Sequence, residues 1–206
     1  MGTPKYIAVA GNMGAGKTSL VEFLCGRYGL KPFYEAFAAN PYLADFYGEM
    51  SRWAFASQVC FLTRKLALHL DLEATGGSEA VVLDRTIYED AEVFATNLRN
   101  MGHLTGRDWD TYRDLYDTVR RRLRPPDIMI YLRCPVPSLR RRIKARGREM
   151  ERDVPATYLR RLNGLYEEWF ARYDQSPVAV VDTGRMDYLT DLVHRIDLLK
   201  AVEAHL

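Results

Sequence analysis

Residues 11–18 read Gly-Asn-Met-Gly-Ala-Gly-Lys-Thr and match the pattern GxxxxGK[ST] at every fixed position. Glycines in such a turn reach backbone conformations closed to other residues, so successive N–H groups can face phosphate oxygens. The pattern predicts that Lys17 reaches the outer phosphates of ATP and that the Thr18 hydroxyl binds Mg²⁺. The predicted nucleotide-binding set is Gly11, Asn12, Met13, Gly14, Ala15, Gly16, Lys17 and Thr18. A chance glycine-rich turn between a strand and a helix is the alternative.

The surroundings of this loop favour the phosphate-binding interpretation. An apolar run at 5–10 precedes it, and apolar residues at helical spacing follow it up to Tyr28. Further short β-rich runs occur at 32–35, 80–84, 128–132 and 178–181. Helical patterns separate or follow them at 43–74, 88–100, 108–123, 136–146, 156–173 and 187–204. The alternation predicts an α/β fold with a five-stranded parallel sheet wrapped by helices, a P-loop kinase (NTPase) architecture in a single domain over residues 1–206.

Two acidic residues end predicted strands, where parallel sheets bind their ligands. Asp84 can order Mg²⁺, and Arg85 beside it can neutralise charge that moves toward an acceptor oxygen. A salt bridge at the end of the strand is the alternative. Glu35 can accept the proton of an attacking hydroxyl, although its spacing fits an ordinary surface glutamate equally well.

An arginine-rich stretch runs through residues 140–148. Arg142 and Arg146 are four residues apart and share a helical face, and Gly147 then ends the helix. We expect a lid at about residues 146–154, with Arg142, Arg146 and Arg148 around the phosphates and water excluded from them. A solvated helix face or a weak nucleic-acid patch is the alternative.

The composition limits the classes of partner. The chain has 206 residues, 48% hydrophobic and 27% charged, which is typical of a globular protein. A net charge of +2 is too small for a nucleic-acid coat or a polybasic membrane anchor. The three cysteines are far apart, and neither a membrane span nor a secretory leader is evident. We therefore expect a cytoplasmic protein with no nucleic-acid partner and no membrane partner.

Two further motifs complete the pattern. They are Asp84-Arg85-Thr86-Ile87-Tyr88-Glu89-Asp90 with Phe94, and Arg142…Arg146-Gly147-Arg148-Glu149-Met150-Glu151. Together with the phosphate loop they resemble the deoxynucleoside kinase family, and most of all its bacterial purine branch, over nearly the whole chain. This resemblance implies transfer of the γ-phosphate of ATP to the 5′-hydroxyl of deoxyadenosine or deoxyguanosine in nucleotide salvage.

The resemblance also implies roles at the reacting end. Glu35 matches the proposed general base, and Arg85 matches the arginine that holds this base and the transferring phosphate. Asp84 matches an acid connected to Mg²⁺, which some accounts make the proton acceptor instead. Arg142, Arg146 and Arg148 match the lid arginines.

Other residues match the deoxynucleoside site of the family. Tyr47 and Glu151 match the pair that grips the sugar 3′-hydroxyl. Gln58 matches the amide that reads the base, Asp90 the carboxylate at the far edge of the base, and Phe94 an aromatic wall. A side-chain amide offers a donor and an acceptor together, as adenine recognition requires.

The sequence departs from the family pattern at a few positions. Ala36 replaces a common proline, and Thr86 replaces the usual serine. The basic residue expected after Gln58 is assigned to Arg64, with Lys65 as the alternative, so a preference for adenine over guanine stays open.

Two rival functions are a P-loop kinase of another acceptor, such as a nucleoside monophosphate, and a non-catalytic nucleotide-binding regulator. Tyr47, Gln58 and Glu151 argue against a phosphorylated acceptor, because a carboxylate repels phosphate. Family members are usually dimers, so we expect a homodimer formed through 43–74 and 108–123. A hetero-oligomer with a related kinase subunit is the alternative.

Overall fold

The structure, a computed structural model, describes residues 6–34, 39–74, 79–148, 151 and 154–184, together with positions 194, 196 and 200. Three sequence predictions fall wholly or partly outside these residues. They concern Glu35, the lid positions 149–150 and 152–153, and most of the helix expected at 187–204.

Within the described residues, five parallel strands form one sheet in the order β2-β3-β1-β4-β5. The strands are β1 (Tyr6–Ala10), β2 (Lys31–Phe33), β3 (Val81–Asp84), β4 (Ile128–Arg133) and β5 (Val178–Asp182). Every residue of β1 and β3 is buried, as expected for strands covered on both faces. The predicted α/β architecture with a five-stranded parallel sheet is confirmed.

The helices follow the predicted order but differ at their bounds. They are α1 (Lys17–Tyr28), α2 (Leu43–Gly48), α3 (Met50–Ala74), α4 (Ile87–Glu89), α5 (Thr96–Asn100), α6 (Gly106–Arg120), α7 (Val136–Arg146) and α8 (Ala156–Phe170). The helix expected at 43–74 is broken at Glu49, whose φ of −143° and ψ of 78° are not helical. It therefore forms two helices, α2 and α3.

The helix expected at 88–100 contains a π-helical segment, η2 (Asp90–Ala95), between α4 and α5. The backbone N–H of Thr96 donates a hydrogen bond to the carbonyl of Ala91, five residues earlier, and the Thr96 hydroxyl donates to the same carbonyl at 2.8 Å. Such wide turns are rare and are found at functional sites. Here the segment carries Asp90 and Phe94, which both line the pocket described below.

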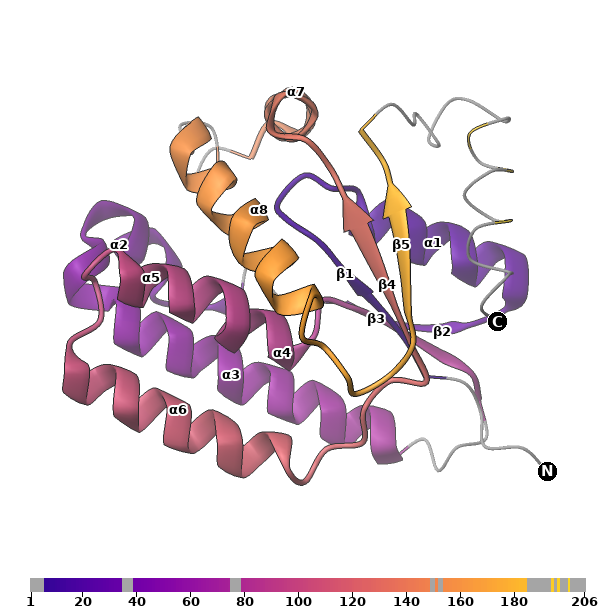
Figure 1. Cartoon of the computed structure of the whole chain (residues 1–206). Helices are drawn as coiled ribbons and strands as arrows, with labels where there is room; N and C mark the ends of the chain where they lie inside the picture. The colour runs from indigo at the N-terminus through magenta and orange to yellow at the C-terminus, as the bar shows by residue number, and fades with distance from the viewer. Residues whose placement is uncertain are drawn as a thin grey trace.

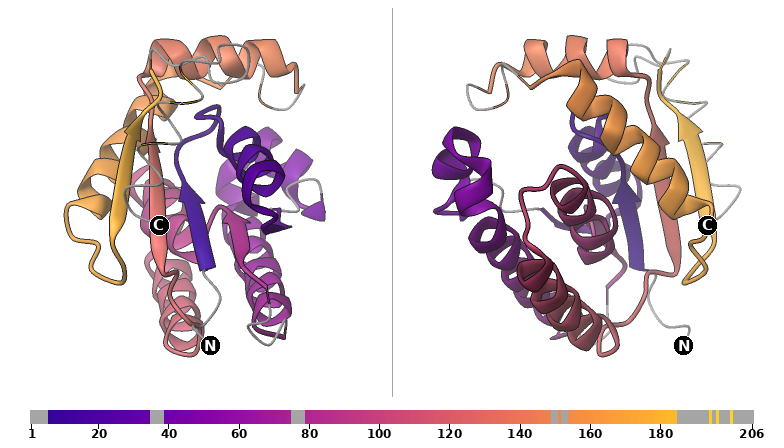
Figure 2. Two further views of the ribbon diagram at one scale, coloured as in Figure 1. Left: turned by 90° about the vertical axis from the view of Figure 1, so that its right-hand side faces the viewer. Right: turned by 60° about the vertical axis from the view of Figure 1, so that its left-hand side comes forward.

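The sheet brings the predicted functional residues to one edge. Val9 pairs with Asp84, so the turn after β1 and the end of β3 are neighbours. Helix α7 lies across the end toward which the strands point, and α3 and α6 lie side by side away from it (Figures 1 and 2). No helix in the described part of the chain is long and apolar enough to cross a membrane.

Candidate active site

The loop between β1 and α1 has the backbone geometry of a phosphate cradle. Its glycines have positive φ values of 150° (Gly11), 76° (Gly14) and 102° (Gly16). A Cβ atom on Gly11 would lie 2.9 Å from the Leu132 carbonyl oxygen, and one on Gly14 would lie 2.9 Å from Ile143 Cγ1. The loop is therefore packed tightly against β4 and α7 and excludes larger residues at these positions.

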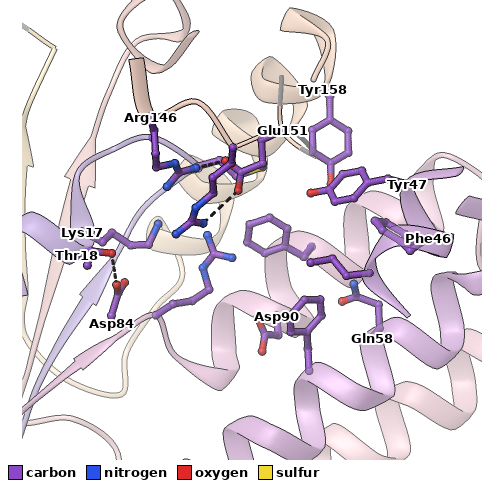
Figure 3. A pocket seen from close by; sticks show the side chains of 17 residues that line it. Lys17, Thr18, Phe46, Tyr47, Gln58, Asp84, Asp90, Arg146, Glu151 and Tyr158 are labelled. Atoms are coloured by element: carbon purple, nitrogen blue, oxygen red, sulfur yellow. Dashed lines mark hydrogen bonds and ion pairs between the residues drawn. The ribbon is translucent and has the colours of Figure 1, made fainter. Parts of the chain in front are cut away.

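Lys17, Thr18 and Asp84 meet beside this loop. The Lys17 ammonium donates hydrogen bonds to the carbonyls of Gly11 (2.8 Å) and Asn12 (3.2 Å). The Thr18 hydroxyl donates to Asp84 Oδ2 at 2.6 Å (Figure 3). A hydroxyl and a carboxylate are the hard oxygen ligands that Mg²⁺ prefers, and this ion usually takes its remaining ligands from phosphates and water. The donor set therefore fits Mg²⁺.

Arg85 follows Asp84 in a strained backbone conformation. Its φ of 67° lies in the left-handed region, which is uncommon for a residue other than glycine. The buried Lys65 ammonium donates hydrogen bonds to the carbonyls of Arg85 (2.8 Å) and Asp84 (3.3 Å). The Arg85 guanidinium lies over the ring of Phe94, 4.4 Å from its centroid. Because strain of this kind persists only where the surroundings enforce it, this turn is a marker of function.

An open pocket of about 850 Å³ joins these groups. One end is cationic and holds Lys17 and Arg146, whereas the other is mainly aromatic and holds Phe46, Tyr47 and Tyr158 (Figure 3). Arg85, directly after Asp84, and Arg148, which pairs with Glu151, add two more cations to the lining. The residues that line it are Met13, Gly14, Lys17, Thr18, Leu43, Phe46, Tyr47, Gln58, Phe61, Asp84, Arg85, Asp90, Phe94, Arg146, Arg148, Glu151 and Tyr158.

The aromatic end holds the residues predicted to read a nucleoside. The Gln58 side chain is buried, and its Oε1 has no hydrogen-bond partner within the described residues. A buried polar atom in that condition is costly unless a ligand supplies the missing bond. Burial raises the pKa of Tyr47, and the nearby Tyr158 and Glu151 add to the shift. The phenol therefore stays protonated and can donate a hydrogen bond.

Glu151 links the two ends of the pocket. It is buried, and its carboxylate forms ion pairs with Arg146 and, at 3.4 Å, with Arg148 (Figure 3). The two arginines are themselves about half exposed or less, at 36% and 47% of their side-chain surface. The Glu151 carboxylate thus holds both arginines at the cationic end of the pocket, and it lies across the pocket from Tyr47.

The structure does not bring every predicted residue to the pocket. Arg64 is exposed on α3 and is not among the residues that line the pocket, so the structure does not bring it to the base end. Its neighbour Lys65 is buried but binds the turn at Arg85, as described above. Arg142 does not line the pocket either, because its guanidinium donates to the carbonyls of Ala15 (3.0 Å) and Thr183 (2.8 Å). Glu35 lies outside the described residues.

Several wall residues were not expected from the sequence. Leu43, Phe46 and Phe61 line the pocket without carrying any polar motif. Helical spacing is the signal that could have found two of them, since Leu43 lies four residues before Tyr47 and Phe61 lies three residues after Gln58. Buried apolar residues on a helix are nevertheless core residues in most cases, so spacing alone does not single them out.

The chain is similar in sequence to known proteins over most of its length. The family model for deoxynucleoside kinases matches residues 7–206. A deoxyadenosine/deoxycytidine kinase of Bacillus subtilis is 35% identical over 189 residues, which cover 90% of this chain and 85% of that one. A deoxyguanosine kinase of Lactobacillus acidophilus is 33% identical over 212 residues, 95% of this chain and 91% of that one.

Solved structures agree with these relatives. Deoxyadenosine kinase from M. mycoides, with the products dCMP and dCDP bound, superposes with a TM-score of 0.83 at 30% identity. The match covers 98% of this chain and 100% of that one. The same enzyme with bound dATP gives a TM-score of 0.80, covering 95% and 97% of the two chains. With the phosphate loop, the Asp84–Arg85 turn and the two-ended pocket in one site, the chain belongs to the deoxynucleoside kinase family.

Proposed function

We propose that this enzyme transfers the γ-phosphate of ATP to the 5′-hydroxyl of a deoxynucleoside, with deoxyadenosine preferred. The observation that carries this proposal is a pocket whose cationic end adjoins an aromatic end that contains the buried amide of Gln58. A neutral, flat ligand fits the aromatic end, and a polyphosphate fits the cationic end. Relatives named for deoxyadenosine and for deoxyguanosine support the same reaction.

Positioning and charge neutralisation supply most of the acceleration in phosphoryl transfer. The loop N–H groups and Lys17 bind the phosphates of ATP, and Arg146 and Arg148 close on them as part of a lid over about residues 146–154. Arg85 neutralises charge between donor and acceptor. Glu35, two residues after β2 ends, accepts the proton of the 5′-hydroxyl in this proposal; the family resemblance supports that role.

Thr18 and Asp84 would hold Mg²⁺, which when bound with ATP neutralises charge on the phosphates. Their oxygens lie 2.6 Å apart, so both can reach one small ion after a modest separation.

The base end favours adenine. The Asp90 carboxylate accepts hydrogen bonds only, so in this proposal, where it faces the 6-position of the purine, it suits the amine of adenine and repels the O6 of guanine. Gln58 can complement either base by rotating its amide. Lys65, the buried cation nearby on α3, is bonded to backbone carbonyls instead of offering a donor to O6. Tyr47 and Glu151 both line the pocket, and in this proposal they bind the 3′-hydroxyl, a role that the family resemblance supports.

The test is product formation from labelled ATP with each of the four deoxynucleosides, with deoxyadenosine monophosphate as a competing acceptor. We expect transfer to deoxyadenosine with the highest kcat/KM and little transfer to the monophosphate, because the proposed acceptor is a free 5′-hydroxyl that Glu35 deprotonates and the monophosphate has none. Folded protein that phosphorylates none of the four would overturn the proposal. A Glu35→Gln variant should lose several powers of ten in kcat while it still binds ATP.

We also propose that residues 1–206 form one domain, that the enzyme is a homodimer, and that it is cytoplasmic. The dimer prediction is supported by α3 and α6, which lie side by side and expose Leu70 and Leu115. Light scattering on the purified chain tests it, and a mass of one chain would exclude the homodimer. A related kinase subunit as partner is the alternative.

A further inference from the structure

Glu89 is a fully buried carboxylate that does not line the pocket. Its Oε2 accepts a hydrogen bond from the Thr86 backbone N–H at 2.9 Å, as part of a capping box at the start of α4. Its Oε1 accepts a second bond, at 3.1 Å, from the backbone N–H of Gly11. The capping box accounts for the first bond only. The second joins α4 to the first glycine of the phosphate loop, 78 residues away in the chain.

Tyr166 on α8 completes this contact. Its hydroxyl lies 2.7 Å from Glu89 Oε1 and 2.9 Å from the Gly11 carbonyl oxygen. The ring is fully buried and stacks on Tyr131, with centroids 5.7 Å apart. Burial raises the pKa of Tyr166, and the Glu89 carboxylate raises it further, so the phenol stays protonated and remains a donor.

Both backbone polar groups of Gly11 are therefore held by side chains from outside the loop. The same Gly11 carbonyl accepts the hydrogen bond from Lys17, so whatever fixes this carbonyl also fixes the ammonium that binds phosphate. Gly11 is also packed tightly, because a Cβ atom at this position would lie 2.9 Å from the Leu132 carbonyl oxygen.

Helix α8 also holds the next residue of the loop. The Asn12 side-chain amide donates to the Leu159 carbonyl (3.0 Å) and to Asn163 Oδ1 (2.7 Å). Leu159, Asn163 and Tyr166 are spaced by four and three residues, so they lie on one face of the helix. Tyr158, at the start of the same helix, lines the pocket. One rigid helix thus contacts both the phosphate loop and the wall of the pocket.

We propose that Glu89 and Tyr166 are positioning residues for phosphoryl transfer. They hold Gly11, and through it Lys17, in register with Arg85, whose Nε lies 3.9 Å from the same Glu89 carboxylate. This inference rests on the proposed function and deepens it. Neither residue touches the reacting atoms; they act by placing the groups that do. Since a displacement of about 1 Å can cost a hundredfold in rate, loss of this placement is expected in kcat.

Tyr166→Phe is the decisive variant, because it removes only the hydroxyl and keeps the stacked ring. Tyr131→Phe is the matched control: it removes a tyrosine hydroxyl in the same aromatic cluster that donates to the carboxylate of Glu167, at 2.9 Å, and not to the loop. For each we measure kcat, the KM of ATP and of deoxyadenosine, and Tm. We expect Tyr166→Phe to lower kcat roughly tenfold and to raise the KM of ATP, with the KM of deoxyadenosine within about twofold of wild type. Tyr131→Phe should leave kcat within about twofold, at a comparable loss of Tm.

Equal kcat values for the two variants, or a lower Tm for Tyr166→Phe with unchanged kcat, would overturn the inference. The Glu89→Gln variant, alone and combined with Tyr166→Phe, adds a thermodynamic cycle. The two losses in kcat should be less than additive, because both changes release the same glycine; fully additive losses would count against the pairing.

The wild-type enzyme separates this test from the test of function. If wild type phosphorylates no deoxynucleoside, the proposed function fails. The positioning inference is then decided by the dissociation constant of a fluorescent ATP analogue, which we expect to be several-fold higher for Tyr166→Phe than for Tyr131→Phe. Equal constants would overturn it.

Discussion

Replacing Lys65 with methionine tests how the strained turn at Arg85 is maintained. The Lys65 ammonium is 3% exposed and donates hydrogen bonds to the carbonyls of Arg85 and Asp84. Arg85 has a φ of 67° and carries the guanidinium that faces the pocket. Methionine has nearly the same length as lysine, so the variant removes the charge and its donors but leaves no large cavity.

The magnitude follows from three terms. Each buried carbonyl left without a donor costs about 1–3 kcal/mol. Removing a buried ammonium relieves a desolvation penalty of several kcal/mol, so the net change in global stability is small. The left-handed backbone of Arg85, however, stores about 1–3 kcal/mol of strain, and the variant lacks the ammonium that holds the backbone in this conformation. We therefore expect the turn to relax and the activation free energy to rise by about 2 kcal/mol, which lowers kcat/KM roughly thirtyfold.

The assay is steady-state transfer from ATP to deoxyadenosine, with thermal unfolding of the same samples. Lys31→Met is the control, because Lys31 is an exposed lysine on β2 whose ion pair with Glu79 contributes little. We expect its kcat/KM to match wild type. If the Lys65→Met enzyme keeps kcat/KM within about threefold of wild type, the ammonium does not maintain the catalytic turn, and the reasoning is refuted.

Three further predictions concern other parts of the chain. Burial, together with the charge of Lys65, lowers the pKa of His69 from 6.5 to about 4. Between these two pH values the unfolded chain binds a proton at His69 that the folded chain does not bind. The free energy of unfolding therefore decreases as the pH falls from 6.5 to about 4. Between pH 7.5 and 5 this costs about 2 kcal/mol in urea unfolding, and His69→Gln should lose less over the same interval. Glu151→Ala should raise the KM of deoxyadenosine about tenfold or more, yet leave the KM of its 3′-deoxy analogue nearly unchanged; equal effects on both would exclude contact with the 3′-hydroxyl. Gly14→Ala places a Cβ 2.9 Å from Ile143 Cγ1 at a positive φ and should lower Tm and ATP affinity, whereas the same change at Gly164, where nothing lies within 4 Å, should raise Tm slightly.

The parts of the fold that were predictable are the ones encoded locally. The loop at 11–18 combines conformational requirements and chemistry within eight consecutive residues, and each buried strand is a short, nearly continuous apolar run. Such signals do not depend on what lies far away in the chain. The break at Glu49 is also local, and Gly48 directly before it is a signal that the sequence offered. The π-helical segment Asp90–Ala95 contains no glycine or proline, so no such signal marks it.

Two predicted site residues, Arg64 and Arg142, do not line the pocket, because the direction of one long side chain decides whether a residue reaches it. Arg64 and Lys65 are consecutive on α3, so about 100° of helix rotation separates them, and the packing of α3 against the end of β3 decides which one is buried. Arg142 is on the expected helix, and its guanidinium donates to the carbonyl of Ala15 in the phosphate loop and to that of Thr183 after β5, so it contacts the loop without lining the pocket. Glu89 belongs to the Asp84–Asp90 motif, but its hydrogen bond to Gly11 joins residues 78 positions apart, one after β3 and one after β1. Sequence spacing therefore does not predict it.

Arg85 connects the two halves of the site. Its guanidinium lies over Phe94, which belongs to the base end, and its Nε lies 3.9 Å from Glu89, which holds the phosphate loop. A base that packs against Phe94 would therefore also affect the position of Arg85, the cation that we propose faces the transferring phosphate. In this arrangement a poorly fitting base lowers kcat as well as affinity, because specificity in phosphoryl transfer is expressed in the placement of the reacting groups. Such a base should therefore give a lower kcat than deoxyadenosine even at saturating concentration.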